Sequence, residues 1–500
     1  MRLLTLWALL LVCSTSFAIE SLEAPPEPLS VMDRSEFIPG FLPLYWDKDE
    51  GQLFADIHEI KEPLIYYNGL SHGVGSNDLG LDRGRLGDTY LVEFDRVGQK
   101  VFLTAINTKY VARSENLAER RAVEEAFARS IIWGFEVVEA TDEHVFIDLT
   151  DFALSDATGL SEHLAARGEG SYAIDASRSA IYKAKTKSFP DNTEIDATLT
   201  YAGQSEGAIL RTVAPNPSAI TVHSHHSFVR LPDDGYTPLP FDPRAGYIDS
   251  GEASLVYDYA SPIDAPVKSA FARRHRLEKV DPTAEISEAV EPIVYWVDSG
   301  APEPVKTALI EGALWWNQAF EAAGYKDAFQ VKVLPAGVDS MDIRYNVIQW
   351  VHRSTRGWSY GASVRDPRTQ EILKGHVTLG SLRVRQDYLI AEGLVAPYGD
   401  SNSSEAIGEF ALARIRQLSA HEVGHTLGIA HNFAASADDR ASVMDYPHPF
   451  VTLTESGEVE LGDAYDEGIG AWDKRAIVWG YQDFPEGDSE ADGRAAIIEE

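Results

Sequence analysis

The chain has 500 residues, a formal net charge of −35 and 44% hydrophobic residues. This length leaves room for two or three domains, and the composition is that of an ordinary globular protein. The acidic balance argues against nucleic acid and anionic membrane surfaces as partners, because both are bound through basic patches. It is typical of a well-solvated acidic surface.

The first residues have the pattern of a secretory signal peptide. Arg2 supplies the positive charge, residues 3–12 form an apolar run too short to span a bilayer, and Ala18 ends a small-x-small cleavage site. We therefore predict a signal peptide over residues 1–18 and an exported protein, secreted or periplasmic, with no membrane insertion after signal removal. The only cysteine, Cys13, lies inside this segment, so the mature chain would have no disulfide.

A long region with mostly strand patterns follows. Residues 19–36 are rich in Pro and Glu and are predicted to be a flexible segment. Residues 37–231 then show alternating apolar positions and two hairpins, around the turns DKDEG and RVGQ. Residues 117–137 have helical apolar spacing instead. We predict a β-rich N-terminal domain, built either as a sandwich or as an open, curved sheet.

Three histidines near the end of this region, His223, His225 and His226, raise the alternative of a metal site. His223 and His225 share one face of the predicted strand and could chelate an ion. No carboxylate or cysteine stands near them in the sequence, so a polar strand face is the favoured interpretation.

Residues 232–291 are richer in Pro, Asp and Tyr and are predicted to be an extended connector or pro-segment. A plain interdomain linker is the favoured interpretation of this segment.

The second half of the chain alternates strand and helix patterns. Residues 292–298, 329–335 and 343–353 are predicted strands, and residues 304–324 are a predicted helix. A hairpin around the turn DPRTQ follows, and then a long helix is expected over residues 405–428.

The most specific motif ends this helix, where residues 421–433 read HEVGHTLGIAHNF. His421 and His425 are one turn apart on one helix face, so both imidazoles can reach one ion. Gly428 lets the helix stop, because glycine takes a left-handed conformation at little cost, and His431 then returns as a third ligand. Three neutral nitrogens and a water make an open, catalytic zinc site, so we predict Zn²⁺ as the cofactor.

Glu422 and the later stretch SVMDYP, which contains Met444, complete the metzincin signature. The chain therefore resembles the metzincin clan of zinc metallopeptidases. The stretches WWNQAFEAAG and AYDEGIGAWDKRAIVWGY further resemble a bacterial family of secreted zinc-dependent metalloproteases with a large N-terminal domain of unknown function. The resemblance implies an α+β fold in which residues 292–500 form a metzincin-like catalytic domain, a mixed twisted sheet with two long helices. It also implies that Met444 forms a structural Met-turn, an apolar base under the ligands.

The predicted mechanism gives Glu422 the role of general base toward a zinc-activated water that attacks a peptide carbonyl. Tyr446 stands two residues after Met444, where some metzincin families use a Tyr to bind zinc or steady the oxyanion. The alternative for Tyr446 is a packed ring with a hydrogen-bonded hydroxyl. In this fold an edge strand pairs with an extended polypeptide substrate, and residues 375–379 are the predicted edge.

A secreted zinc-dependent endopeptidase is the favoured function. The alternatives are an exported binding protein with a structural zinc site, and a zinc hydrolase of non-peptide substrates. In many metzincins a pro-segment crosses the active-site cleft, which gives the N-terminal half three alternatives: a pro-region that is removed, an intramolecular inhibitor, or a permanent partner domain. An Asp or Glu of residues 232–291 would then take the inhibitory role. The helical pattern is still running at Glu500, so we expect the natural chain to continue.

Overall fold

The computed structural model describes residues 29–248, 255–355, 357–395, 404–484 and 489–499. The predicted signal peptide, residues 1–18, lies outside the described residues. Within the described residues, no helix is both long enough and apolar enough to cross a membrane.

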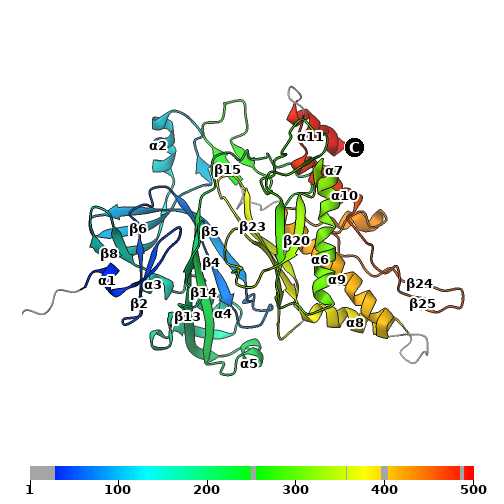
Figure 1. Ribbon diagram of the computed structural model, residues 1–500, viewed down its shortest axis with the longest axis horizontal. Helices are drawn as coiled ribbons and strands as arrows, with labels where there is room; N and C mark the ends of the chain where they lie inside the picture. Colours follow the sequence, from blue (N-terminus) through cyan, green and yellow to red (C-terminus); the bar gives the residue numbers. More distant parts are fainter. Residues whose placement is uncertain (1–28, 249–254, 356, 396–403, 485–488, 500) are drawn as a thin grey trace, which may run out of the picture.

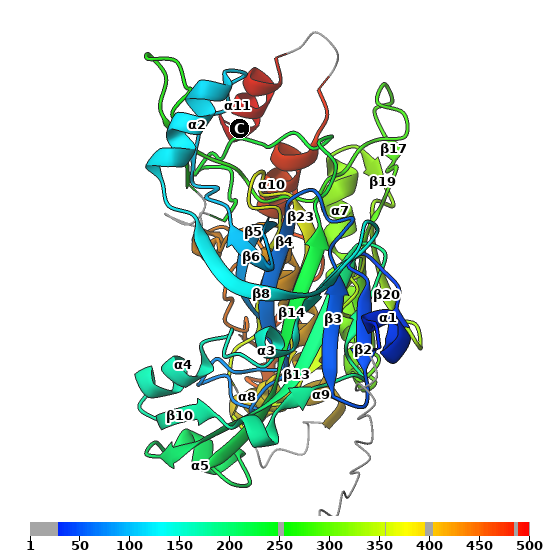
Figure 2. The same cartoon turned by 90° about the vertical axis from the view of Figure 1, so that its left-hand side faces the viewer.

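A single antiparallel sheet of 13 strands forms most of the N-terminal half (Figure 1). The strand order is β1-β2-β3-β9-β8-β6-β5-β4-β14-β13-β10, with β11 and β12 also paired to β13. The strands are β1 (Glu36–Ile38), β2 (Leu44–Asp47), β3 (Gln52–Asp56), β4 (Leu64–His72), β5 (Arg85–Val97), β6 (Lys100–Ala105), β8 (Ser130–Ala140), β9 (Val145–Asp148), β10 (Gly170–Ile174), β11 (Ala180–Ile181), β12 (Lys187–Ser188), β13 (Asn192–Ser205) and β14 (Ala219–Arg230). Of the two predicted forms, the structure has the curved sheet (Figure 2).

Both predicted hairpins of this domain are present, as the antiparallel pairs β2–β3 and β5–β6. The apolar core lies on one side of the sheet, where Tyr66, Phe135 and Tyr201 are fully buried. Four short helices accompany the sheet, namely α1 (Val31–Arg34), α3 (Thr150–Ala153), α4 (Leu160–Ala166) and α5 (Ile209–Val213), and α3 places Phe152 in the apolar core.

The predicted helix over residues 117–137 is wrong in its second half. The helix α2 (Leu117–Ala126) begins after the N-cap Asn116 and ends at Phe127. Residues 130–140, SIIWGFEVVEA, form β8 instead and pair with β6 and β9. This segment is rich in β-branched and aromatic residues, which favour a strand when neighbouring strands are available for pairing.

The second half contains a mixed, five-stranded sheet in the order β20-β18-β21-β23-β22. These strands are β18 (Ile293–Val297), β20 (Phe329–Val333), β21 (Asn346–Val351), β22 (Tyr360–Arg365) and β23 (Ile372–Gly380). Only β22 is antiparallel to its neighbour, and it forms the edge. The predicted edge, residues 375–379, is wrong, because those residues lie in β23, which is paired on both sides. The hairpin of β22 and β23 is present as predicted. The prediction of the edge failed because β23 also pairs with β21, which is distant in the sequence.

Helices cover the face of this sheet that is turned away from the N-terminal sheet (Figure 1). The helices on the sheet are α6 (Val305–Leu314), α7 (Trp316–Ala322) and α9 (Ser404–Thr426). A second set packs on these helices: α8 (Leu382–Leu394) on α9, α10 (Ala471–Tyr481) on α7, and α11 (Glu490–Glu499) on α10. The predicted helix over residues 304–324 is divided at Trp315 into α6 and α7. The helix α9 carries the histidine motif at its carboxyl end.

Residues 232–291, the predicted connector, run along the catalytic half. They contain the strands β15 (Leu255–Asp258), β16 (Lys268–Ala270) and β17 (Ser287–Glu288); β15 and β16 form a small sheet with β7 (Tyr110–Val111), and β17 pairs with β19 (Tyr325–Lys326). Leu239, Tyr247, Ala272 and Leu277 are buried in the same apolar core as α6, α7 and α9. The segment 232–291 is therefore packed into the core of the catalytic half, which a plain interdomain linker would not be.

The helices α6 and α9 cross closely at Gly312, where an added Cβ would collide with the carbonyl group of Arg416. We expect Gly312→Ala to push the helices apart and to lower the free energy of unfolding by about 1–3 kcal/mol, the usual cost of overpacking. Gly408→Ala is the matched control on α9, because nothing lies within 4 Å of its Cβ. It should keep or raise the stability. Denaturant unfolding of both variants measures the difference, and equal effects would contradict the close crossing.

Candidate metal centre

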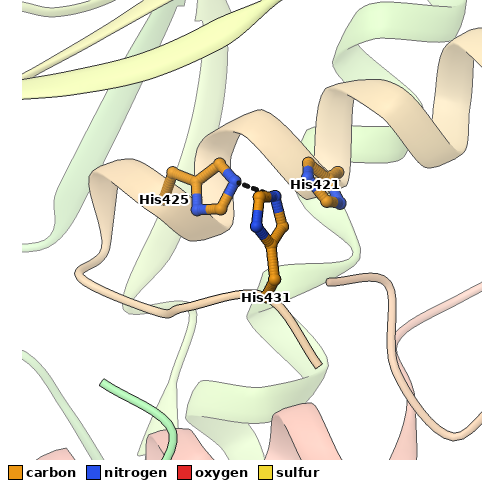
Figure 3. A group of neighbouring side chains, drawn as sticks. All are labelled: His421, His425 and His431. Carbon is orange, nitrogen blue, oxygen red and sulfur yellow. Dashed lines mark hydrogen bonds between the residues drawn. The ribbon is translucent and has the colours of Figure 1, made fainter. Parts of the chain in front are cut away.

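Three imidazoles come together at the end of α9 (Figure 3). His421 and His425 project from the helix, and His431 projects from the chain that returns beneath it. One nitrogen atom of each ring lies within 4.8 Å of the other two, and the Nε2 atoms of His425 and His431 are 3.1 Å apart. No other group of three or more His, Cys, Asp or Glu side chains in the described part of the chain is arranged this closely.

Hydrogen bonds to backbone carbonyl groups fix the orientation of two of these rings. Nδ1 of His421 donates to the carbonyl oxygen of Val443 at 2.8 Å, and Nδ1 of His425 donates to that of Ile429 at 2.9 Å. A carbonyl oxygen can only accept, so each Nδ1 carries the proton and each Nε2 keeps its lone pair. Burial also lowers the pKa of His425 to about 4 and holds the pKa of His421 well below its usual range. Neutral imidazoles in this arrangement fit a zinc ion.

The chain reverses after α9 through Gly428, which has a φ of +92°. The N–H of Ile429 donates to the carbonyl oxygen of Gly424 at 2.9 Å, which closes the last turn of the helix. A side chain at Gly428 would also collide with the carbonyl group of Arg273, which belongs to the segment 232–291. Glycine is therefore required both for the left-handed conformation and for this close approach.

Met444 is fully buried beneath α9. A Cβ added to Gly424 would collide with the Met444 sulfur and lie 2.6 Å from the ring of Trp316. The carbonyl oxygen of Met444 accepts a hydrogen bond from the N–H of Asn432 at 3.0 Å, so the Met-turn also holds the residue after His431. The motif itself does not specify Gly424, and only the packing beneath the helix reveals why it is needed.

Asp473, in the first turn of α10, holds the Met-turn from below. Its buried carboxylate accepts hydrogen bonds from the hydroxyl of Ser442 at 2.6 Å, the N–H of Val443 at 2.8 Å and the N–H of Gly470 at 3.0 Å. The carbonyl group of Val443 in turn binds His421. Sequence reasoning missed this residue, although its place three residues after Gly470 is typical of a capping position.

Glu422 follows His421 directly and is 4% exposed. Its carboxylate accepts no hydrogen bond from any residue that the structure describes. Burial raises the pKa of Glu422 to about 8, and the guanidinium groups of Arg414 and Arg353 oppose this shift. A buried carboxylate without a partner, adjacent to a metal-ligand candidate, is suited to proton transfer.

Tyr446 lies on the open side of the three imidazoles. Its ring centroid is 4.7 Å from that of His431 and 5.2 Å from that of His421, and the residue is 58% exposed. Its hydroxyl makes no hydrogen bond within the described residues, so the packed, hydrogen-bonded alternative does not match. Asp445 points the other way and accepts hydrogen bonds from the N–H of Tyr446 and the hydroxyl of Ser436.

His223 and His225 of β14 contact carboxylates, His226 contacts the hydroxyl of Tyr66, and the three form no metal cluster among the described residues. Nε2 of His225 contacts the carboxylate of Glu194, and Nδ1 of His223 lies 3.2 Å from Oδ1 of Asp196. The expectation that no carboxylate stands near them is wrong, because β13 pairs with β14 and supplies both acids. The preferred interpretation, a polar strand face, matches these contacts.

Comparison with protein families gives two matches. Residues 403–500 match a family model described as Met-zincin, and residues 84–280 match a domain of unknown function (DUF5117). A search of curated proteins gives no match. The first match contains the three imidazoles and Met444, so the resemblance to metzincins is confirmed. It indicates a zinc metallopeptidase in general terms.

We expect Asp473→Asn to loosen the Met-turn, because an amide offers one acceptor oxygen where the carboxylate offers two. The free energy of unfolding should fall by about 1–3 kcal/mol, and the zinc affinity should fall by roughly 10–100-fold. Chemical unfolding and competition with a chelator measure the two effects. Asp466→Asn, a substitution at an exposed position of the same segment, is the control. Unchanged zinc affinity in Asp473→Asn would show that the Met-turn does not depend on this carboxylate.

Proposed function

Since the chain carries a Met-zincin region, we propose that it is a zinc-dependent endopeptidase that hydrolyses polypeptides, with His421, His425 and His431 as the metal ligands. The observation that carries this proposal is the orientation of the imidazoles. Two Nδ1 atoms are engaged by carbonyl groups, and the three rings converge with the unpartnered carboxylate of Glu422 beside them. This is the donor set of a catalytic site with an open coordination position.

A zinc ion bound there supplies Lewis acidity, which acidifies water and stabilises negative charge on the scissile carbonyl oxygen. Glu422 accepts the proton that the attacking water loses and passes it to the leaving amine. Tyr446 extends its free hydroxyl over the open side of the site, where it can donate a hydrogen bond to the developing oxyanion. Met444 and Gly424 keep the floor of the site apolar and closely packed.

The edge strand β22 is the proposed substrate-binding strand. A Cβ on Gly361 would lie 3.0 Å from Cβ of His425, so the start of β22 runs directly along the histidine motif. Within the described residues β22 pairs only with β23, which leaves its second edge available to an extended peptide. Pairing in the middle of a long substrate is what an endopeptidase requires.

We further propose that the protein is secreted or periplasmic and acts on polypeptides rather than on nucleic acid. The sequence pattern of residues 1–18 and the net charge of −35 support this. Activity on peptide libraries, compared with ester and sugar substrates, distinguishes a peptidase from a zinc hydrolase of non-peptide bonds.

We expect Glu422→Gln to lower kcat for peptide cleavage by about 10²–10⁴-fold, because the amide cannot accept the proton of the attacking water. The variant should bind zinc normally, since Glu422 is not a ligand. Peptide turnover and the zinc content of the purified protein are the two measurements. A variant with full zinc content and wild-type turnover would contradict the role of Glu422, and an inactive wild-type protein with tightly bound zinc would favour a structural zinc site.

Tyr446→Phe removes a hydroxyl group that makes no hydrogen bond within the described residues and whose ring contacts His421 and His431. We expect kcat to fall by roughly 10²-fold, the usual effect of losing an oxyanion donor, with little change in KM or zinc content. Phe433→Leu is a suitable control, because Phe433 also stacks on His431 but has no hydroxyl. Wild-type kcat in Tyr446→Phe would contradict a role of the hydroxyl, and a loss confined to Phe433→Leu would assign the effect to packing on His431.

A further inference from the structure

The chain on both sides of β22, and Val364 near the end of the strand, contact the N-terminal half of the molecule. Three groups of contacts hold the strand: the loop of residues 73–84, which we call the clamp loop, the strands β4 and β14, and the segment 232–291. The segment 232–291 also contacts the end of α9, where the carbonyl group of Arg273 approaches Gly428. The strand proposed to bind substrate is therefore held between the zinc helix and a domain that has no catalytic motif.

The clamp loop fixes the chain just before β22. Nη2 of Arg353 lies 2.7 Å from Oδ2 of Asp82, and the two side chains are 1% and 2% exposed. Nη1 of Arg353 and Nδ2 of Asn77 both donate to the carbonyl oxygen of Trp358, each at 2.7 Å. At Gly357, which has a φ of +56°, an added Cβ would lie 2.8 Å from Cβ of Asn77. The peptide that enters β22 thus has no room to shift.

Further contacts reach the same peptide from the backbone and from the loop surface. The N–H of Ser354 donates to the carbonyl oxygen of Gly75 at 2.9 Å, and the hydroxyl of Thr355 donates to Asp78 at 2.9 Å. With its carbonyl group held, Trp358 presents an indole that is 57% exposed at the start of the strand.

The end of β22 is held by apolar packing. Val364 is 1% exposed and belongs to a cluster with Ile65 and Tyr67 of β4 and Val229 of β14. Removal of the N-terminal domain would expose this side chain and leave Arg353 without its counter-charge. An unpaired buried charge is strongly unfavourable, so the catalytic half is not built to stand alone.

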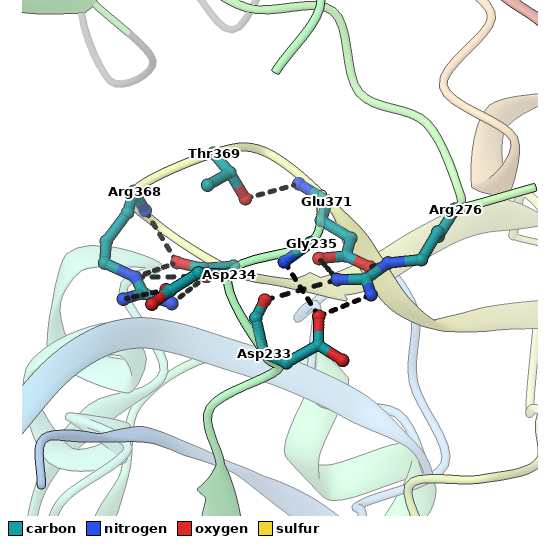
Figure 4. A network of polar contacts seen from close by, with 8 residues as sticks. Asp233, Asp234, Gly235, Arg276, Arg368, Thr369 and Glu371 are labelled. Carbon is teal, nitrogen blue, oxygen red and sulfur yellow. Dashed lines mark hydrogen bonds and ion pairs between the residues drawn. The ribbon is translucent and has the colours of Figure 1, made fainter. Parts of the chain in front are cut away.

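The turn after β22 is held by the segment 232–291 (Figure 4). Arg276 lies between two acids, with Nε 2.9 Å from Oε1 of Glu371 and Nη1 2.6 Å from Oδ1 of Asp233. Arg368 of the turn pairs with Asp366 at 2.8 Å and lies 3.9 Å from Oδ1 of Asp234, which belongs to the segment 232–291. Both ends of the strand are therefore fixed from the N-terminal side.

We propose that the N-terminal domain is a permanent part of the peptidase that positions β22 for substrate, with Asp82 and Asn77 as positioning residues. This inference rests on the proposed peptidase function. It assigns the domain the role of a support for the substrate-binding strand, in place of that of an inhibitor that is removed.

The test compares Asp82→Asn and Asn77→Ala in the full chain on two peptides with the same cleaved bond. One peptide is short, and the other is long enough to pair along all of β22. We expect kcat/KM for the long peptide to fall about tenfold, since misplacement of binding groups by a fraction of an ångström is costly, while the short peptide changes little. Zinc content should stay the same. Asn77→Ala loses a single hydrogen bond and decides the test if Asp82→Asn does not fold.

Lys187→Met is the matched control. Lys187 also crosses between the two halves, to Asp339 at 2.6 Å, but Asp339 follows β20 at the opposite edge of the catalytic sheet. This variant should leave the ratio of long-peptide to short-peptide kcat/KM unchanged. An unchanged ratio in active Asn77→Ala, or an equal change in Lys187→Met, would overturn the proposal.

Hydrogen exchange makes the result independent of activity. Amides of residues 358–365 should exchange faster in Asp82→Asn and Asn77→Ala and at the wild-type rate in Lys187→Met. If wild-type protein cleaves neither peptide, the proposed function fails, and the exchange rates still decide the positioning role. Mass spectrometry of the active, exported protein should find residues 37–291 retained; an active form that begins near residue 292 would overturn the inference.

Discussion

The backbone of Val443, through its N–H and its carbonyl group, is the point on which the metal centre depends. Its carbonyl oxygen accepts hydrogen bonds from Nδ1 of His421 and from Nε2 of Gln417, both at 2.8 Å, and its N–H donates to Asp473. One backbone unit therefore joins α9, the Met-turn and α10. A backbone carbonyl group cannot change its rotamer, so its position depends on the residues that hold the chain. The buried carboxylate of Asp473 holds Val443 in this way and thereby orients His421.

Hydrogen bonds to backbone carbonyl groups also hold the helix α9 against α6 and α7. Nε1 of Trp316 donates to the carbonyl oxygen of Ala420 at 2.8 Å, and the hydroxyl of Ser419 donates to that of Leu309 at 2.7 Å. These are buried polar groups with satisfied partners, and they lie within the apolar core of the catalytic half. A ligand set on such a helix has little freedom to reorganise, which is the condition for a preorganised site.

Features that depend on residues close together in the sequence could be predicted, and features that depend on contacts between distant segments could not. The spacing of His421 and His425 and the left-handed Gly428 are local properties, and the structure has both as expected. The edge strand was misplaced because the partner of β21 is chosen by long-range pairing, which adjacent residues do not encode. The acids beside His223 and His225 were missed for the same reason, since they come from the next strand.

A similar argument explains residues 117–137. The first part has helical spacing and forms α2, but the second part is drawn into the sheet by β6 and β9, and tertiary pairing overrides the local pattern. Asp473 illustrates the opposite case. Its spacing from Gly470 is a local pattern that the prediction did not use, and its role under the Met-turn depends on the fold.

The contact between the two halves is polar enough to fix their relative register. Asn192 of β13 donates to the carbonyl oxygen of Met341 and accepts from the N–H of Ile343, both at 3.0 Å. Together with the buried pair of Arg353 and Asp82, these bonds tolerate no sliding, whereas an apolar interface alone would allow it. A buried ion pair adds little net stability compared with apolar residues, and its better-supported use is to specify one arrangement. In this chain the buried pair fixes the position of β22 beside the histidine motif. The contacts that set how the two halves dock therefore also set the geometry of the proposed active site.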